Sequence, residues 1–279
     1  MKKLSLQNEK KESSRYIVEI FEVNVLHCNR PVNATYYYID MELCETDLSA
    51  FIKTPSFKGE SNIWKIMGQI ASGVYFVHQR GLVIRDLKPS RGSSTPNFIT
   101  MLTLVVLYSK SQIDGIWKLG DFSLVAAEGP QGTQEYVDDP NQIGTEGYRS
   151  PEQLDLSHFN TKTDIWGMGC ILNELVTGQQ LFANDYAIVG PSGYMEKAAT
   201  SIETADVIQP LHIQLSTCLR EVKSLAWKER NDIKMTLLHM LAVLPEERPS
   251  ADDLEEPLRR LIDTGAPSIR TEHGLVRQG

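Results

Sequence analysis

Hydrophobic and polar residues alternate first with the period of a strand. Residues 16–23 alternate in this way, and residues 36–41 are rich in tyrosine and isoleucine after the turn-like Pro31-Val-Asn33. A period of two places one set of side chains on one face of a sheet. We therefore predict two strands that can pair as a hairpin.

Four later stripes of apolar residues recur at helical spacing. The first opens at Ser61 or Asn62, which can cap a helix, and Gly81 can stop it; the second opens near Thr163 and closes at Gly178. Strands followed by helices predict an α+β fold. The stripes are Ile63, Ile66, Met67, Ile70, Val74 and Val77; Ile165, Met168, Leu172, Leu175 and Val176; Met235, Leu238, Leu241 and Leu244; and Leu254, Leu258 and Leu261.

Charge and cysteine content argue against several classes of protein. The chain has 28 Lys and Arg against 36 Asp and Glu and no long basic run, so we expect no binding to nucleic acid or to an anionic membrane. The first 14 residues lack the apolar core of a signal peptide, and the longest apolar stretch, 98–108, is too short to span a bilayer. Four scattered cysteines indicate reduced thiols, so we expect an intracellular protein, cytoplasmic or nuclear.

Polar stretches between these elements carry the candidate chemistry. Val83-Ile-Arg-Asp-Leu-Lys-Pro-Ser90 resembles the catalytic loop of eukaryotic protein kinases. Five motifs in the family's order are not expected by chance, so the sequence is identified as a member of the serine/threonine protein kinase family. The other four are Trp117-Lys-Leu-Gly-Asp-Phe-Ser123, Gly144-Thr-Glu-Gly-Tyr-Arg-Ser-Pro-Glu152, Thr163-Asp-Ile-Trp-Gly-Met-Gly169 and Glu246-Glu-Arg-Pro-Ser250.

The resemblance implies a role for each residue of the loop. Asp86 accepts the proton of the substrate hydroxyl, and Lys88 neutralises charge on the transferred phosphate. Arg85 pairs with the activation segment. A lysine at position 88 resembles the serine/threonine branch rather than the tyrosine branch. His78, several residues earlier, is expected to be a packed core histidine.

Residues outside the loop also receive roles from the resemblance. Asp121 holds Mg²⁺, and Thr145 belongs to the end of the activation segment. Asp164 braces the catalytic loop from below, whereas Glu152 and Arg248 form a buried ion pair.

A hinge between two lobes is implied for Met41-Glu-Leu-Cys44. Met41 is then the gatekeeper of the adenine pocket, and the backbone of Glu42 and Cys44 binds adenine. A short helix is expected over residues 45–52. The resemblance implies ATP and Mg²⁺ as cofactors and a protein as substrate; it does not name the substrate or the oligomeric state.

The resemblance covers about residues 16–262 and implies a protein-kinase-like fold. Residues 1–43 are expected to be a remnant of the β-rich N-lobe with the hinge, residues 44–265 a mostly helical C-lobe, and residues 266–279 a tail. There is no G-x-G-x-x-G before residue 80 and no V-A-I-K, so we expect an N-terminally truncated domain with weak or absent ATP binding.

The catalytic loop departs from the family pattern. Arg91 stands where the family has a Mg²⁺-binding Asn, and a guanidinium cannot ligate a cation. Residues 91–105 are interpreted as an insertion that we expect to be mobile. Alternatively, Asn97 is the displaced metal ligand. Ile84 replaces a histidine and Ser123 a glycine, and neither change removes a chemical group.

Three hypotheses stay open at this point. The protein is an active kinase, or it is a pseudokinase whose large lobe serves as an interaction module. A third hypothesis is an incomplete gene model of an active kinase, with a lost upstream exon and retained non-coding sequence near residues 91–105. The transcript distinguishes the third hypothesis from the second.

Overall fold

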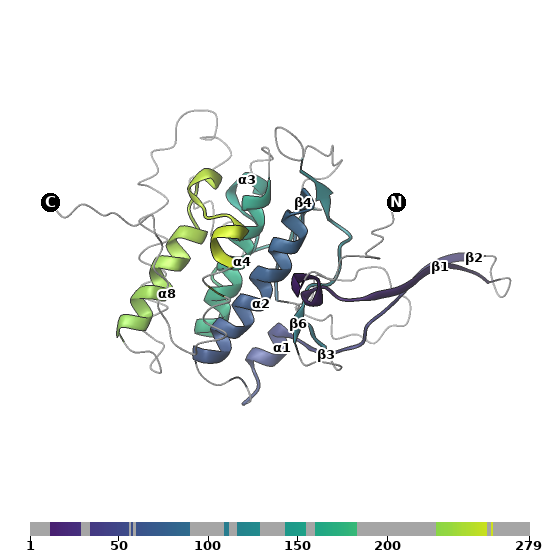
Figure 1. The fold of residues 1–279 in the computed structure, drawn as a ribbon, viewed down its shortest axis with the longest axis horizontal. Helices are drawn as coiled ribbons and strands as arrows, with labels where there is room; N and C mark the ends of the chain where they lie inside the picture. The colour runs from purple at the N-terminus through teal and green to yellow at the C-terminus, as the bar shows by residue number, and fades with distance from the viewer. Residues whose placement is uncertain are drawn as a thin grey trace.

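Helices form the main body of the molecule, and one hairpin projects from it (Figure 1). The structure, a computed structural model, describes residues 12–28, 34–55, 57, 60–89, 109–111, 116–128, 143–154, 160–182, 227–255 and 258. Strands precede the first long helix and further short strands follow it, so the described part of the chain has an α+β arrangement, although the strands do not all come first. None of the described helices is long and apolar enough to cross a membrane.

The projecting hairpin is formed by β1 (Ile20–Cys28) and β2 (Ala34–Met41), which pair antiparallel. The predicted hairpin is therefore confirmed, but its first strand begins later than predicted. Tyr16 ends the 3-10 helix η1 (Glu12–Tyr16), and Val18 donates to the carbonyl of Leu119 at 2.8 Å. Residues 16–18 thus bond to the segment before Asp121 instead of to β2.

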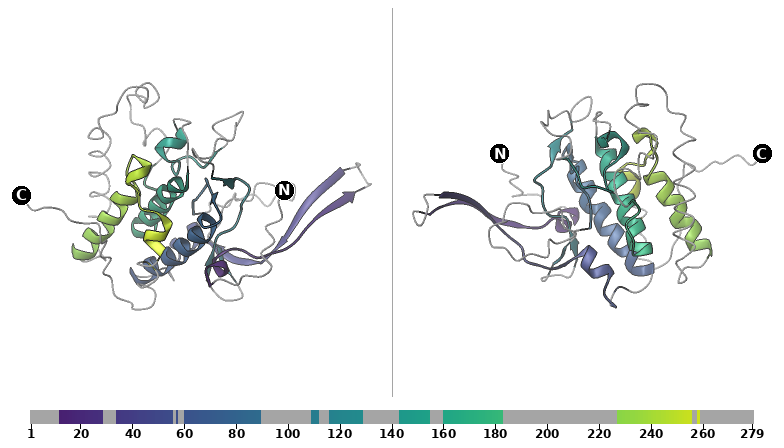
Figure 2. Two further views of the ribbon diagram at one scale, coloured as in Figure 1. Left: turned by 45° about the horizontal axis from the view of Figure 1, so that its top comes forward. Right: turned by 180° about the vertical axis from the view of Figure 1, so that it is seen from behind.

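Large apolar side chains of this hairpin are exposed. Val23 faces Ile39 and Val25 faces Tyr37 across the ladder, so these four side chains share one face. Their exposed fractions run from 38% for Val25 to 65% for Tyr37. Both views in Figure 2 show the hairpin extending away from the helices.

Short strands connect the hairpin to the helical body. The strands β3 (Cys44–Asp47), β5 (Ser109–Ser111) and β6 (Trp117–Lys118) form one sheet in that order. A second ladder pairs β4 (Leu82–Val83) with β7 (Ala126–Ala127). This second ladder places the segment after Asp121 beside the segment that leads to Arg85.

The helix α1 (Leu48–Ile52) is shorter than the helix predicted over residues 45–52. Asp47 ends β3 and caps α1, because its Oδ1 accepts a hydrogen bond from the amide of Ala50 at 2.8 Å. Residues 45–47 belong to β3, in which Thr46 and Asp47 pair with β5, and cannot be helical at the same time.

The long helices α2 (Glu60–His78) and α4 (Thr161–Thr177) lie side by side, and α8 (Trp227–Met240) packs on α4 (Figures 1 and 2). All side chains from Thr163 to Val176 are buried, so α4 is the axis of the body. Asn160 caps its start through the amide of Lys162 at 2.9 Å, and Gly178 ends it at φ 72°. The helix α2, which corresponds to the first predicted stripe, begins at Glu60, so Ser61 and Asn62 lie inside it instead of capping it.

The third predicted stripe is only partly correct, because Leu241 is buried and Leu238 packs against the core but the other two residues are exposed. Met235 is 43% exposed and Leu244 37% exposed. The buried face of α8 carries Ile233, Leu237 and Met240. The helix ends at Met240, so the predicted spacing continues past the last turn into a bend. From the fourth stripe Leu254 and Leu258 are buried, and Leu261 lies outside the described residues.

We predict that Gly167→Ala destabilises the protein, because Gly167 on α4 lies against the backbone of Leu87. An added Cβ would lie 2.9 Å from Leu87 Cβ and 3.1 Å from its carbonyl oxygen. Overpacking should outweigh the helix propensity gained, with a net loss of about 1–2 kcal/mol in the free energy of unfolding. Urea denaturation measures this, with the exposed Lys65→Ala on α2 as control. Equal stability of both variants would contradict the packing described.

Candidate functional site

The backbone of residues 84–89, called here the 84–89 loop, is held from below by Asp164. All six residues are buried. The carboxylate of Asp164 accepts hydrogen bonds from the amides of Ile84 and Arg85, each at 2.8 Å. His78 at the end of α2 donates to the same carboxylate at 2.8 Å. One side chain of α4 therefore fixes the loop and the end of α2 together.

Arg85 is tied to two further segments. Its carbonyl oxygen accepts a hydrogen bond from Gln153 of α3 (Pro151–Leu154) at 2.8 Å. Its side-chain Nε donates to the carbonyl of Leu124 at 2.5 Å, just after the Asp-Phe-Ser motif. This hydrogen bond joins Arg85 to the segment after Asp121, and the pairing with the activation segment stays a prediction. Arg85 also has a φ of 72°, a left-handed conformation that a non-glycine residue adopts only under constraint.

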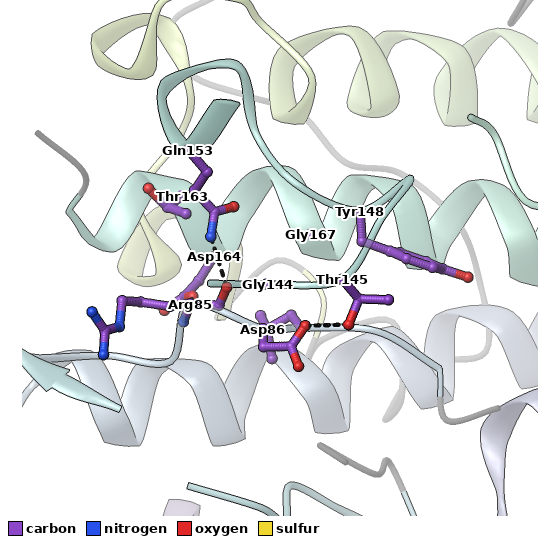
Figure 3. A pocket seen from close by; sticks show the side chains of 10 residues that line it. Arg85, Asp86, Gly144, Thr145, Tyr148, Gln153, Thr163, Asp164 and Gly167 are labelled. Carbon is purple, nitrogen blue, oxygen red and sulfur yellow. Dashed lines mark hydrogen bonds between the residues drawn. The ribbon is translucent and has the colours of Figure 1, made fainter. Parts of the chain in front are cut away.

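Three side chains meet at the end of the 84–89 loop. Lys88 Nζ lies 2.8 Å from Oδ2 of Asp86, and the hydroxyl of Thr145 donates to Oδ1 of Asp86 at 2.7 Å. Lys88 also donates to the hydroxyl of Thr145. Figure 3 shows Asp86 and Thr145 facing one another in a small cavity that Arg85 and Gln153 also line. A carboxylate that can take a proton thus lies beside a cation that can stabilise an anion.

Asp121 follows β6 and has a φ of 51°. Its Oδ1 accepts a hydrogen bond from the amide of Ser123 at 3.0 Å. Ser123 itself does not have a positive φ, so the serine fits this conformation where the family has glycine. Arg91, Asn97 and the interpreted insertion, residues 91–105, lie outside the described residues.

Asp121 suits a metal ion that arrives with phosphates. Within the described ranges, no group of three or more His, Cys, Asp or Glu residues could hold a metal ion. Mg²⁺ is usually held by one or two carboxylates together with substrate phosphates and water. A single half-buried carboxylate is therefore compatible with Mg²⁺, provided that phosphate oxygens complete the coordination.

The predicted hinge, residues 41–44, is anchored by a buried ion pair. Lys118 Nζ donates to both carboxylate oxygens of Glu42 at 2.8 and 2.9 Å, and only 1% of the Glu42 side chain is exposed. The amide of Glu42 donates to the carbonyl of Glu19 at 2.8 Å. Met41 ends β2, and Cys44 begins β3. The ion pair connects the predicted hinge to β6, three residues before Asp121.

The second buried ion pair joins α3 to the segment after α8. Arg248 donates to the two carboxylate oxygens of Glu152 at 2.6 and 2.8 Å. The guanidinium of Arg248 also donates to the carbonyls of Ala242, Lys162 and Val243 at 2.7, 3.1 and 3.0 Å. Every N–H of the guanidinium therefore has an acceptor.

Two side chains of α4 have shifted pKa values. Burial lowers the pKa of the Lys162 ammonium, although the carboxylate of Asp253 acts in the opposite direction. Burial also raises the pKa of the Cys170 thiol, which lies inside α4. A thiol that stays protonated is a poor nucleophile, so Cys170 is a packing residue in this arrangement.

Several contacts of the site were not predicted. Gln153 follows the Pro-Glu pair directly, and the Glu42–Lys118 pair joins residues that are far apart in the sequence. His78 is a packed histidine, as expected, but it also bonds to Asp164. In the sequence, Lys118 stands directly before Leu-Gly-Asp and Glu42 directly after Met41, so both positions were visible as candidate members of an ion pair. Their pairing depends on the approach of β6 to residues 41–44.

Comparison with known proteins gives the same family as the motifs. The sequence matches the family described as Protein kinase domain over residues 4–257. It is 28% identical over 258 residues to the mitogen-activated protein kinase spm1 of Schizosaccharomyces pombe, covering 87% of this chain and 55% of the relative. It is 27% identical over 217 residues to the serine/threonine-protein kinase atg1 of Dictyostelium discoideum, covering 77% and 28% of the two chains.

A third similar protein is the inactive serine/threonine-protein kinase PLK5 of Mus musculus, 26% identical over 220 residues that cover 78% of this chain and 29% of the relative. The chain therefore spans about half the length of the first of these relatives and less than a third of the other two.

We predict that Arg248→Lys lowers the free energy of unfolding by about 3 kcal/mol, because a lysine cannot bond both oxygens of Glu152 and three carbonyls at once. Chemical denaturation measures the loss. Arg15→Lys, at an exposed arginine, is the matched control and should change stability by less than about 0.5 kcal/mol. A loss at position 248 no larger than that of the control would mean that the ion pair does not stabilise the fold.

Proposed function

This chain belongs to the protein kinase domain family, and on that premise we propose that it is a serine/threonine protein kinase. The reaction is transfer of the γ-phosphoryl group of Mg-ATP to a serine or threonine hydroxyl of a protein. We expect this activity to be impaired in this chain, because its sequence has no G-x-G-x-x-G before residue 80 and no V-A-I-K. The observation that carries the proposal is the contact of Asp86 with both Lys88 and Thr145 at the end of a rigidly held loop. The two lobes of this proposal are residues 1–43 and 44–265.

Asp86 has the role of proton acceptor in this proposal. The substrate oxygen forms a bond to the γ-phosphorus while the bond from that phosphorus to ADP breaks, and the hydroxyl proton passes to Asp86. Asp86 is only 8% exposed, so few water molecules compete for its carboxylate. Its oxygens accept from Lys88 and Thr145, which orients the carboxylate before a substrate arrives.

Lys88 supplies the positive charge next to the transferred group. Its ammonium has three N–H donors, of which two bond to Asp86 and Thr145. Charge that develops on the phosphoryl oxygens is stabilised by a cation already held in place. The hydroxyl of Thr145 accepts from Lys88 and donates to Asp86, so it keeps both side chains at a fixed separation.

Binding of ATP and Mg²⁺ is proposed for two separate groups of residues. The backbone of Glu42 and Cys44, with Met41 beside it, holds the adenine, and the Glu42–Lys118 pair keeps this segment close to β6. Asp121 contributes a carboxylate to Mg²⁺, with Asn97 as the candidate second ligand. When bound, the ion neutralises charge on the phosphate oxygens.

A second candidate function is an interaction module without phosphoryl transfer. Arg91 stands where the family has a metal-binding Asn, and one similar protein is described as inactive. The apolar face of the β1–β2 hairpin is exposed, and such a two-stranded hairpin is marginally stable unless another surface covers it. These observations support a binding role as the second candidate, so a direct assay is needed to separate the two functions.

We predict that Asp86→Asn lowers the rate of phosphoryl transfer by about 10²–10⁴-fold, because the amide cannot accept the hydroxyl proton. Transfer of labelled γ-phosphate to a generic serine- and threonine-rich protein measures the rate. Mg-ATP affinity, measured by calorimetry, should stay within about twofold, because Asp86 acts on the hydroxyl. The exposed Asp252→Asn is the matched control and should keep the full rate.

The same assay separates the two candidate functions. Transfer by the unmodified protein that Asp86→Asn removes supports the kinase. A protein that is folded and binds Mg-ATP but transfers no phosphate contradicts the kinase and supports the interaction module.

A further inference from the structure

We propose that Gln153 is a positioning residue that holds the backbone immediately before Asp86 in its working conformation. The proposal rests on the proposed function of Asp86 as proton acceptor. Gln153 lies on α3, 6% exposed, and its Nε2 donates to the carbonyl oxygen of Arg85 at 2.8 Å. That carbonyl belongs to the peptide whose nitrogen is the amide of Asp86, so Gln153 holds the peptide that carries the proton acceptor.

The backbone at this point needs to be held. Arg85 has a φ of 72°, which is unfavourable for a residue with a Cβ. Two side chains fix this residue from opposite ends, because Asp164 of α4 accepts from its amide and Gln153 of α3 donates to its carbonyl. Figure 3 shows both side chains directed at the backbone of Arg85. The strained residue is thus fixed by two elements that come from different parts of the chain.

The amide side chain of Gln153 satisfies both sides of this contact. Oε1 of Gln153 accepts from the amide of Ser150 at 3.0 Å and from its hydroxyl at 3.3 Å. Nε2 must then donate, and it faces the Arg85 carbonyl. A carboxylate in this place would keep the acceptor but would set a negative oxygen against that carbonyl. The contact also requires Gly144, where a Cβ would lie 3.1 Å from Nε2 and 3.3 Å from the Arg85 carbonyl oxygen.

The test uses Gln153→Glu, which has the same shape, keeps the acceptor for Ser150 and loses the donor to Arg85. Hydrogen exchange of the full-length protein, followed by mass spectrometry, needs no catalytic activity. We expect amides in residues 83–89 to exchange at least about tenfold faster, whereas amides in residues 63–77 of α2 stay unchanged. Ser150→Ala is the matched control: it removes a hydroxyl from the other side of Gln153 and should leave residues 83–89 protected.

Kinetics give a second readout when the unmodified protein transfers phosphate. Gln153→Glu should then lower kcat by about tenfold or more and change KM for Mg-ATP by less than about twofold, since the base is misplaced and the nucleotide contacts are intact. If the unmodified protein is inactive, that result contradicts the proposed function but not the role of Gln153, because the exchange experiment still tests the position of the loop.

Unchanged exchange in residues 83–89 of a folded Gln153→Glu variant would overturn the proposal. Faster exchange throughout the protein, with an equal effect in α2, would also overturn it, because Gln153 would then be a general packing residue. Gln153→Met replaces the glutamate variant where that variant does not fold. It lacks both contacts and should expose residues 83–89 and 150–154 together while α2 stays protected.

Discussion

The carboxylate of Asp164 is the interaction on which the rest of the site depends. It lies in the first turn of the buried helix α4 and accepts hydrogen bonds from two backbone amides and one histidine. The 84–89 loop has no partner strand or helical hydrogen bonds of its own, so these contacts replace regular structure. A buried carboxylate is tolerable only when it is paired and bonded, which constrains the loop to one arrangement.

Other charged contacts extend this arrangement to distant segments. The Glu152–Arg248 pair fixes α3 against the segment after α8, and α3 in turn carries Gln153 to the loop. On the opposite side, Glu42–Lys118 joins the predicted hinge to the strand that ends near Asp121. Buried ion pairs contribute little net stability when their desolvation is counted, but removal of one partner is costly. In this protein, the two ion pairs therefore permit few alternative positions of the segments that they join.

Elements with a strong local spacing of apolar residues were predicted correctly from the sequence. The stripe from Ile165 to Val176 has strong helical spacing and a glycine stop, and it matches the buried axis α4. The order of the motifs identified the family and directed attention to Asp86, Lys88, Asp121 and Asp164. Where local spacing was weak, the prediction failed in part: α8 is polar on average, and the predicted stripe included the exposed Met235 and missed the buried Ile233 and Leu237. Gln153 and Lys118 contact segments distant in sequence, so local spacing does not predict their partners.

Residue-resolved amide exchange by NMR shows whether Asp164 holds the 84–89 loop. We predict that the amides of Ile84 and Arg85 exchange slowly although they lie outside helices and strands. Asp164→Asn should accelerate both by about tenfold or more, because the amide group offers one acceptor where two oxygens served. The amide of Ile70 inside α2 should keep its protection. Fast exchange of Ile84 and Arg85 in the unmodified protein, or slow exchange that Asp164→Asn leaves unchanged, would contradict the account.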